Sequence, residues 1–417
     1  MEIQSLKPIH FFDLAGAPMF DVSEHGDVCF HSCSEVEKDS TLYIVKANSE
    51  VIQTPIPGTQ LPVRLDFDVP RIRAPKVTNR YIYVATHSHP YHPDETAHYI
   101  QTDLNGRVIW EWTVDGCPMA NVVTSQGGQY ILYCVRVSDF KTSCELTYLS
   151  EYGESLWTIR DKWISHGGSI VLRSDDSVLI AKDSTRGISM RAPRISQIIS
   201  IDTSGEIAAK MNTLKKMTGY RVGGSLAKTP NYIIGENILF VRENEPFFSL
   251  TPDMGYKPRF IPTDVTEFNL INGELRQKKL ELGMVRTSLW DEDRRILYVS
   301  SIMEENAVVK IDIDNWVVDY HRFKQRQPYY NNFKFLTEPP GASYYVNHCT
   351  PVLTIQEDII FCNSTSSLLC MTPDWKEKWT MLLPEGACDM KVSGNNLYVM
   401  CYREDKREAI LQRFILL

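Results

Sequence analysis

The stretch that most constrains the fold of this chain is residues 78–116, TNRYIYVATHSHPYHPDETAHYIQTDLNGRVIWEWTVDG. It contains three strand-like runs, at 81–86, 97–102 and 107–114, and a preceding run at 71–77 adds a fourth. The last two runs of the stretch are separated by Asp103-Leu104-Asn105-Gly106, in which Asn-Gly supplies the positive φ that a hairpin turn requires. Four short antiparallel strands joined in this way predict one blade of a β-propeller.

The same pattern recurs along the chain, in units at 19–56, 120–160, 168–212, 223–282, 285–323, 350–383 and 389–415. The last unit has only three strands, and an isolated strand at 8–14 precedes the first unit. Pairing of 8–14 with 409–415 would complete the last blade and close the ring without an open sheet edge. The sequence therefore predicts an all-β, single-domain propeller over residues 1–417. About eight four-stranded blades fit, and seven also fit because the unit at 223–282 is irregular.

The composition supports a folded, acidic protein. The 417 residues are 43% hydrophobic and 11% aromatic, which is ample for a core, and the net charge is −8. An acidic surface argues against nucleic acid and anionic membranes as partners. No apolar run reaches the roughly 20 residues of a membrane span, and the first residues lack the pattern of a signal peptide.

The ten cysteines are scattered, mostly in apolar strand-like runs such as YILYC (130–134) and DIIFC (358–362). None forms a CxxC pair or a zinc-ligand spacing. Together with the missing export signal, this predicts reduced thiols that pack as small hydrophobes in a cytoplasmic protein.

Several units echo one another where the third strand turns into the fourth: TDLNGRVIWEW, SEYGESLWTI, IDTSGEIAAK, LINGELRQKK and TPDWKEKWTM. This resembles the PQQ-like repeat of quinoprotein-dehydrogenase-type propellers. In that repeat a strand ends in Asp, the chain turns through Gly, and an aromatic residue about four positions later packs between blades. We assign such packing to tryptophans 110, 112, 157, 316, 375 and 379. The resemblance is one of fold, and it does not imply PQQ as a cofactor, because the adjacent-cysteine pair of some quinoprotein alcohol dehydrogenases is absent.

Arginines gather where the innermost strands of different units begin, close to the mouth of the expected central channel. Arg73, Arg221 and Arg286, with Asn121, are the candidate ligand-binding residues. Because guanidinium groups bind carboxylate, sulfate or phosphate in a bidentate manner, converging arginines favour an anionic small molecule. The alternative is that these arginines form ion pairs between blades.

The segment HSHPYH suggests a metal site. In an extended chain residues two apart share one side, so His87 and His89 could bind one metal, with His92 or His98 completing the set. An iron, zinc, copper or manganese ion with an open position could activate water or dioxygen. The alternative is a solvated polar loop.

Two further histidines, His166 and His348, directly precede innermost strands and are candidate general bases or nucleophiles. This placement resembles arylsulfotransferase propellers, which use a channel histidine flanked by Arg and Asn. The alternative is a histidine that satisfies backbone groups between blades.

Two function classes follow. The first is a cytoplasmic enzyme or ligand-binding protein that holds an anionic small molecule at a His- and Arg-lined channel mouth, with or without a metal. The second is a non-catalytic scaffold that presents its rim to a protein partner. Long, individual loops favour the first class, and the absence of a recognisable catalytic constellation favours the second.

Overall fold

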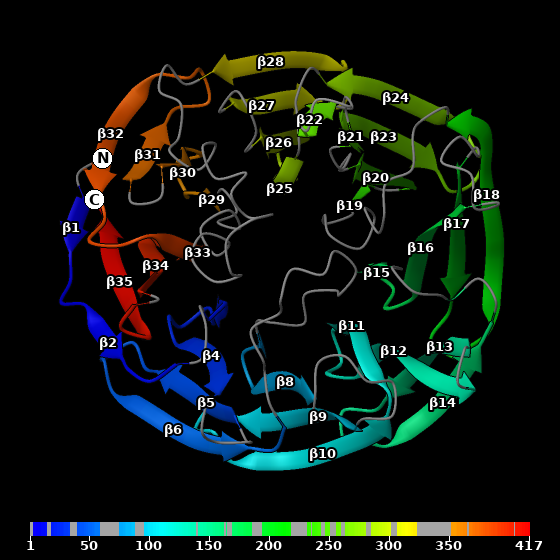
Figure 1. The fold of residues 1–417 in the computed structure, drawn as a ribbon, viewed down its shortest axis with the longest axis horizontal. Coiled ribbons are helices and arrows are strands. Elements are labelled where there is room, and N and C mark those ends of the chain that lie inside the picture. The colour runs from blue at the N-terminus through cyan, green and yellow to red at the C-terminus, as the bar shows by residue number, and fades with distance from the viewer. Residues whose placement is uncertain are drawn as a thin grey trace.

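The computed structural model of the protein describes residues 3–14, 18–33, 40–58, 75–87, 96–138, 141–161, 164, 169–185, 194–217, 232–234, 236–242, 247–250, 256–259, 263–280, 285–301, 307–322, 352–364, 367–403 and 405–417. Every regular element in these ranges is a β-strand, which confirms the all-β class. Within the same ranges, no helix is long and apolar enough to cross a membrane. Eight antiparallel sheets stand around a ring (Figure 1). We call them blades 1 to 8, in the order in which the chain reaches their innermost strands.

In blades 1 to 7 the strands follow chain order from the ring axis to the rim. Blade 1 consists of β3 (Phe20–Val22), β4 (Val28–Cys33), β5 (Ser40–Val45) and β6 (Val51–Ile56), and blade 2 of β7 (Lys76–Val77), β8 (Tyr81–His87), β9 (Thr96–Asp103) and β10 (Val108–Asp115). Blade 3 consists of β11 (Cys117–Val123), β12 (Gln129–Ser138), β13 (Lys141–Leu149) and β14 (Ser155–Arg160), and blade 4 of β15 (Ser169–Leu172), β16 (Val178–Thr185), β17 (Arg194–Ile201) and β18 (Ile207–Met217).

Blade 5 consists of β19 (Tyr232–Ile234), β20 (Asn237–Arg242), β23 (Thr263–Asn269) and β24 (Leu275–Leu280). Blade 6 consists of β25 (Val285–Asp291), β26 (Ile296–Ser301), β27 (Ala307–Asp312) and β28 (Val317–Arg322), and blade 7 of β29 (Val352–Leu353), β30 (Ile359–Ser364), β31 (Ser367–Met371) and β32 (Glu377–Leu382). Blade 5 also carries a separate hairpin, β21 (Phe247–Leu250) with β22 (Tyr256–Arg259), between β20 and β23. The innermost described strand of blade 5 begins at Tyr232 and not at Gly223, as the sequence had suggested.

Blade 8 is built from both ends of the chain. Its inner strands are β33 (Ala387–Ser393), β34 (Asn396–Arg403) and β35 (Glu408–Leu416), and both β1 (Ile3–Ser5) and β2 (Ile9–Phe11) pair with β35. Ile9 lies opposite Leu411 and Ile3 lies opposite Leu416. The predicted pairing of the N-terminal strand with the last blade is therefore confirmed, and β1 extends it.

Buried apolar clusters join every neighbouring pair of blades, including blades 8 and 1. Between blades 8 and 1, for example, Phe11 and Phe30 pack edge to face with ring centroids 4.9 Å apart. Each sheet is thus covered on both faces by its neighbours. This explains why second and third strands such as β31 are continuously buried rather than alternating.

Candidate functional site

The two ends of the ring differ in the length of their connections. At one end, which we call the turn face, lie the turns from first to second and from third to fourth strands. At the other end, the loop face, the chain passes from second to third strands and into the next innermost strand. The connection from β9 to β10 spans only 104–107, whereas those from β6 to β7 and from β28 to β29 span 57–75 and 323–351. The predicted channel mouth belongs to the loop face.

Of the candidate site residues, Asn121, Arg286, His87 and His98 lie in described strands. Asn121 is half-buried in β11, opposite Ile131. Arg286 occupies a register shift near the loop-face end of β25, between Val285 and Thr287. The remaining candidates lie outside the described residues: Arg73, Arg221, His89, His92, His166 and His348.

His87 is the last residue of β8 and pairs with Ala97, so it lies where the chain leaves the sheet on the loop face. His98, considered as a further metal ligand, has another partner. Its Nδ1 lies 2.7 Å from Oε1 of Glu111 on the neighbouring strand. This contact within blade 2 gives the His98 ring a hydrogen-bonding partner in the frame. Among the described residues no three His, Cys, Asp or Glu side chains form a group that could hold a metal ion.

Many of the described arginines pair with carboxylates of the frame. Arg160 Nε donates to Glu145 at 2.8 Å, and Arg294 Nε donates to Asp291 at 2.5 Å. Arg276 Nε lies 2.9 Å from Glu267, which is nearly buried. Each of these pairs lies within a single blade, where it joins neighbouring strands or closes a hairpin turn. They do not test the alternative of ion pairs between blades for Arg73, Arg221 and Arg286.

Asp389, near the start of the innermost strand of blade 8, also belongs to the frame. The carboxyl is 1% exposed and accepts backbone N–H groups of Phe20 in blade 1, at 3.1 Å, and of Met390, at 2.9 Å. Desolvation by burial raises the pKa of Asp389. The residue ties blade 8 to blade 1.

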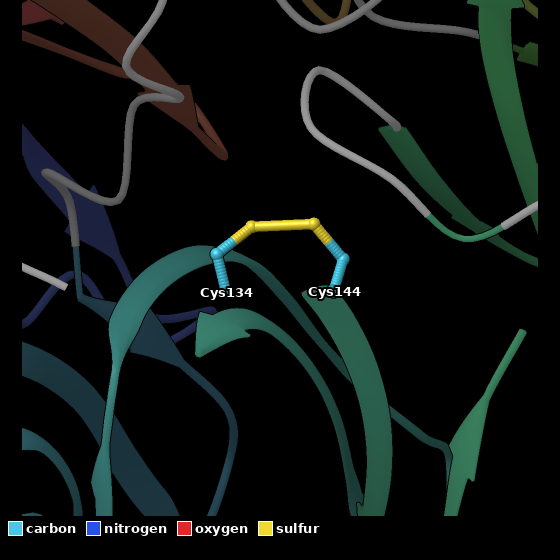
Figure 2. Close-up of a disulfide and its surroundings, with 2 residues drawn as sticks. All are labelled: Cys134 and Cys144. Atoms are coloured by element: carbon cyan, nitrogen blue, oxygen red, sulfur yellow. A yellow bond between two sulfur atoms is a disulfide. The ribbon is translucent and has the colours of Figure 1, made fainter. Parts of the chain in front are cut away.

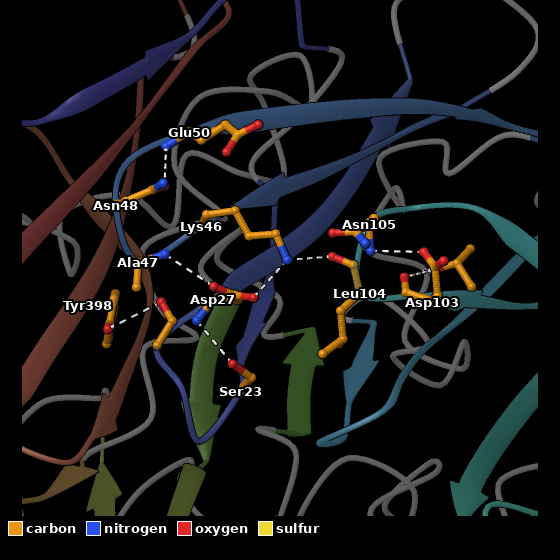
Figure 3. Close-up of polar contacts among 12 residues, drawn as sticks. Ser23, Asp27, Lys46, Ala47, Asn48, Glu50, Asp103, Leu104, Asn105 and Tyr398 are labelled. Atoms are coloured by element: carbon orange, nitrogen blue, oxygen red, sulfur yellow. Dashed lines mark hydrogen bonds and ion pairs between the residues drawn. The ribbon is translucent and has the colours of Figure 1, made fainter.

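On the turn face, a donor from the preceding blade reaches one backbone carbonyl of the third-to-fourth turn in blades 1, 2, 3, 4, 6 and 7. Lys46 Nζ donates to Leu104 O at 2.6 Å while also bonding Asp27 at 2.9 Å, and Figure 3 shows it between the two. Trp110 Nε1 donates to Glu151 O at 2.9 Å. In every described case the acceptor is the second residue of the turn. The full set of acceptors is Ala47, Leu104, Glu151, Thr203, Ile313 and Pro373, with donors Arg413, Lys46, Trp110, Trp157, Arg276 and Lys310.

The first-to-second turns are linked in a parallel way. Tyr83 donates to Gly127 O at 3.0 Å, and Tyr130 donates to Asp176 O at 2.8 Å, in each case across a blade boundary. Burial raises the pKa of Tyr83 to about 12, so the phenol stays a neutral donor. The turn face is therefore occupied by contacts between blades. Sequence reasoning missed these acceptors because they are backbone atoms, although the Trp four residues after a Gly marked two of the donors.

Blade 3 contains a disulfide between Cys134 and Cys144 (Figure 2). The two residues are directly opposite on β12 and β13, with Cα atoms 4.2 Å apart. The expectation that Cys134 is a free thiol is therefore wrong. The sequence did contain a signal for the disulfide, because positions 134 and 144 lie at equal distances in sequence from position 139. The described free thiols, such as Cys370, are buried, and burial raises the pKa of Cys370 to about 12, so they are poor nucleophiles.

These features define the protein as an eight-bladed β-propeller. Hydrogen bonds between blades hold the turns of its turn face, and the connections of its loop face differ in length.

No protein-family profile matches the chain, and no curated protein matches it in sequence. Its fold is similar to that of three solved propellers. Sqt1 from Saccharomyces cerevisiae aligns with TM-score 0.55 and 10% identity over 98% of this chain and 99% of that one. Hydrazine synthase from Kuenenia stuttgartiensis aligns with TM-score 0.50 and 12% identity over 96% of both chains. BamB from Moraxella catarrhalis aligns with TM-score 0.47 and 11% identity over 99% and 98%. The likeness to Sqt1 and to hydrazine synthase confirms the β-propeller fold that the repeat had implied.

Proposed function

We propose that the protein binds an anionic small molecule at the loop face, over the mouth of the channel. Arg73, Arg221 and Arg286 would hold the anion, and Asn121 would add a neutral hydrogen-bonding group. The observation that carries the proposal is the difference between the two faces of the ring. Short turns and contacts between blades occupy the turn face, whereas the loop face has long connections that a frame alone does not require.

Position supports Arg286 in this role. It lies near the loop-face end of an innermost strand, at an irregularity in the register, and such irregularities often re-aim a side chain beside a site. The described arginines of the outer strands, such as Arg160 and Arg276, have carboxylate partners instead.

Sequence also supports a basic mouth. The segments that lead into the innermost strands of blades 2, 5 and 7 contain more basic than acidic residues, although the whole chain carries −8. The basic residues are Arg64, Arg71, Arg73, Arg221, Lys228, Lys324, Arg326 and Lys334, and the acidic ones are Asp66, Asp68 and Glu338.

Thermal shifts with sulfate, phosphate and dicarboxylates test the proposal. A charge-assisted contact stabilises by about 1.5–3 kcal/mol, so a bound anion should raise Tm. The shift should be reduced in Arg221→Ala and Arg286→Ala but kept in Arg295→Ala, which removes an exposed turn-face arginine paired with Asp314. If no anion shifts the parent protein, or if Arg295→Ala loses the shift equally, the mouth is not the site.

A catalytic form of the same function would use His166 or His348 as base or nucleophile, in the manner of arylsulfotransferase propellers. A metal bound by His87, His89 and His92 would supply Lewis-acid or redox chemistry, with iron, zinc, copper and manganese as candidates. Elemental analysis of purified protein and of His87→Ala/His89→Ala tests this form. If the purified protein stays metal-free after incubation with all four ions, the metal-assisted form is rejected. The proposal that the loop face binds an anion would then remain.

The second candidate function is a scaffold for a protein partner. The pairing of described arginines with carboxylates of the frame favours it, because these residues stabilise the blades and do not bind a ligand.

We also propose that the protein is cytoplasmic. The disulfide removes one support for it, since disulfides form mainly in oxidising compartments.

A further inference from the structure

Tyr152 is an exposed aromatic residue in a well-ordered turn of the turn face. It follows Glu151 in the third-to-fourth turn of blade 3 and is 71% exposed. Backbone hydrogen bonds close this turn, from Gly153 N to Ser150 O at 3.0 Å and from Ser150 N to Glu154 O at 2.9 Å. The turn therefore presents the tyrosine at the surface in advance, and a partner that contacts it would not have to order the backbone.

The frame does not require a tyrosine at this position. In the other turns whose carbonyl accepts a donor from the preceding blade, the residue after the acceptor is Asn48, Asn105, Ser204, Asp314 or Asp374. These are small polar residues, which turns favour because they bond to the nearby backbone. An exposed tyrosine is instead typical of a surface that binds another protein, where aromatic residues contribute much of the affinity.

The turns on one side of Tyr152 are strongly acidic. In blades 3, 4 and 5 the first-to-second and third-to-fourth turns contain eight acidic residues and one basic residue, Arg173. Their net charge of −7 is nearly the whole −8 of the chain. In blade 2, on the other side, the turns carry the exposed Arg80 and Arg107. We call the turns of blades 3 to 5 the acidic sector; they lie at 124–128, 150–154, 173–177, 202–206, 236 and 270–274.

The acidic sector contains a regular row of carboxylates. Glu154, Glu206 and Glu274 each follow the glycine of the third-to-fourth turn, in blades 3, 4 and 5. All three are exposed, and within the part of the chain that the structure describes their carboxylates form no hydrogen bond or ion pair. In blades 2 and 6 the corresponding residues are Arg107 and Val317. The row therefore begins at blade 3 and ends at blade 5.

The three blades of the sector are neighbours in the ring. Buried apolar clusters join blade 3 to blade 4 and blade 4 to blade 5, and Figure 1 shows their outer strands β14, β18 and β24 in succession along the rim. Tyr152 lies in the first of these blades, and Ile271, which is also 71% exposed, lies in the last. The row of carboxylates thus has an exposed apolar side chain at each end.

From this arrangement we propose that the acidic sector is a docking surface for a lysine- or arginine-rich segment of a protein partner, with Tyr152 as its anchor. A cationic side chain of the partner would lie against the Tyr152 ring, which attracts cations through its π face. The hydroxyl of Tyr152 bonds the Glu151 carboxylate, which raises the pKa of Tyr152 and keeps a negative charge beside the ring. Further cations of the segment would pair with the row of glutamates.

A metal ion fits this surface less well. The carboxylates are spread over three blades, and among the described residues no three His, Cys, Asp or Glu side chains form a group that could hold a metal. Nucleic acid would be repelled by a surface of this charge. The proposal does not depend on the anion proposed for the loop face, because it shares no residue with that site.

Fluorescence anisotropy with a labelled octalysine peptide tests the proposal on the full-length protein. We expect binding at low salt that weakens as NaCl is added, because salt screens exposed charges. Tyr152→Asn introduces the residue type that blade 2 has at the same position, Asn105, so the turn should keep its fold. This variant should weaken binding by about two- to fivefold, the effect of one exposed cation–π contact.

A second variant tests the row of glutamates. Glu154→Gln/Glu206→Gln/Glu274→Gln should weaken binding by about fivefold or more, because three exposed ion pairs are lost together. Glu50→Gln/Glu292→Gln/Asp374→Asn is the matched control. It removes the same number of exposed carboxylates from the turns of blades 1, 6 and 7, and its binding should stay within about twofold of the parent. All these variants should keep the melting curve of the parent.

Arg286→Ala should leave octalysine binding unchanged, which separates this surface from the anion site of the loop face. Equal losses in the two triple variants would overturn the proposal, because binding would then follow net charge alone. Unaltered binding in Tyr152→Asn would overturn it as well. Displacement of octalysine by micromolar calcium ion, lost in the variant of Glu154, Glu206 and Glu274, would assign the sector to a metal ion instead.

Discussion

The indole N–H of Trp110 donates a hydrogen bond to the carbonyl oxygen of Glu151 at 2.9 Å, across the boundary between blades 2 and 3. Trp157 repeats the contact one blade further on, with Thr203 O at 3.0 Å. Where the chain has no tryptophan at this position, a lysine or arginine donates to the corresponding carbonyl, as Lys46 does to Leu104 O. The constant element is therefore the turn carbonyl, and the donor varies. This explains how a ring can stay regular while its repeats diverge in sequence.

Removing one such indole donor should cost measurable stability. Trp110→Phe keeps an aromatic ring but leaves Glu151 O without its donor, and a hydrogen bond of this kind contributes about 1 kcal/mol. Trp379 offers a matched control, because its Nε1 has no hydrogen-bond partner within the described ranges. Urea unfolding should give a free energy of unfolding about 1 kcal/mol lower for Trp110→Phe than for Trp379→Phe. Equal losses would show that the indole hydrogen bond contributes nothing.

The glycines of the third-to-fourth turns should differ sharply in tolerance. Gly153 and Gly273 both have positive φ, of 79° and 72°. A Cβ on Gly153 would lie 2.6 Å from Cδ2 of Trp110, whereas one on Gly273 would meet nothing within 4 Å. Gly273→Ala should therefore cost only the backbone strain, about 1–2 kcal/mol. Gly153→Ala should cost about 1–3 kcal/mol more, because the docked indole must move. Thermal and urea unfolding of the two variants measure this difference, and similar melting temperatures would contradict it.

The contact between His10 and Glu408 should make the joining of the chain ends sensitive to acid. Nδ1 of His10, on β2, lies 2.6 Å from Glu408 of β35. The hydrogen bond with His10, aided by the charge of Arg403, lowers the pKa of Glu408. A lowered pKa in the folded state contributes stability above the unfolded value of about 4.3, and this contribution is lost as the pH falls through the folded value.

Glu408→Gln should therefore lower the urea midpoint at neutral pH, and its difference from the parent should shrink towards pH of about 3. Asp202→Asn is a useful comparison, since the pKa of Asp202 is lowered inside a single turn, mainly by the hydroxyl of Ser204. It should show the same sign without loosening the N-terminal strands. A Glu408→Gln effect that stays constant from neutral to acidic pH would refute the linkage.

The disulfide should be directly detectable. Alkylation of unfolded, non-reduced protein should leave Cys134 and Cys144 unmodified, and prior reduction should make both reactive by intact mass. A cross-link that closes a loop of this size stabilises by about 2–3 kcal/mol. A reductant should therefore lower Tm in the parent but not in Cys134→Ala/Cys144→Ala. Full alkylation without reduction would place both residues among the free thiols.

Much of the fold could be predicted because strand, turn and packing signals are local. The run at 107–114 corresponds to β10, and Gly106 has the positive φ, 82°, that its Asn-Gly turn requires. The pairing of the N-terminal strand followed from a count of strands. The start predicted for blade 5 at Gly223 lies outside the described ranges, and the innermost described strand of this blade begins at Tyr232.

The candidate site was less predictable. Convergence at a channel mouth depends on residues from different blades, and most of the candidates, such as His166 and His348, lie outside the described ranges. Where the prediction met a described side chain, as at His98, that side chain had a partner within the frame. An isolated sequence does not show such partners, because they come from another strand or another blade.

The sequence by itself determined the strand-and-turn repeat and the strand that completes the last blade, and it left seven or eight blades open. These depend on side-chain alternation and turn chemistry within a few residues. Only the tertiary structure decided that there are eight blades, which carbonyl each donor reaches and which cysteines pair. Those features are set by the register between strands and the packing between blades, where residues far apart in sequence must share the same few ångströms.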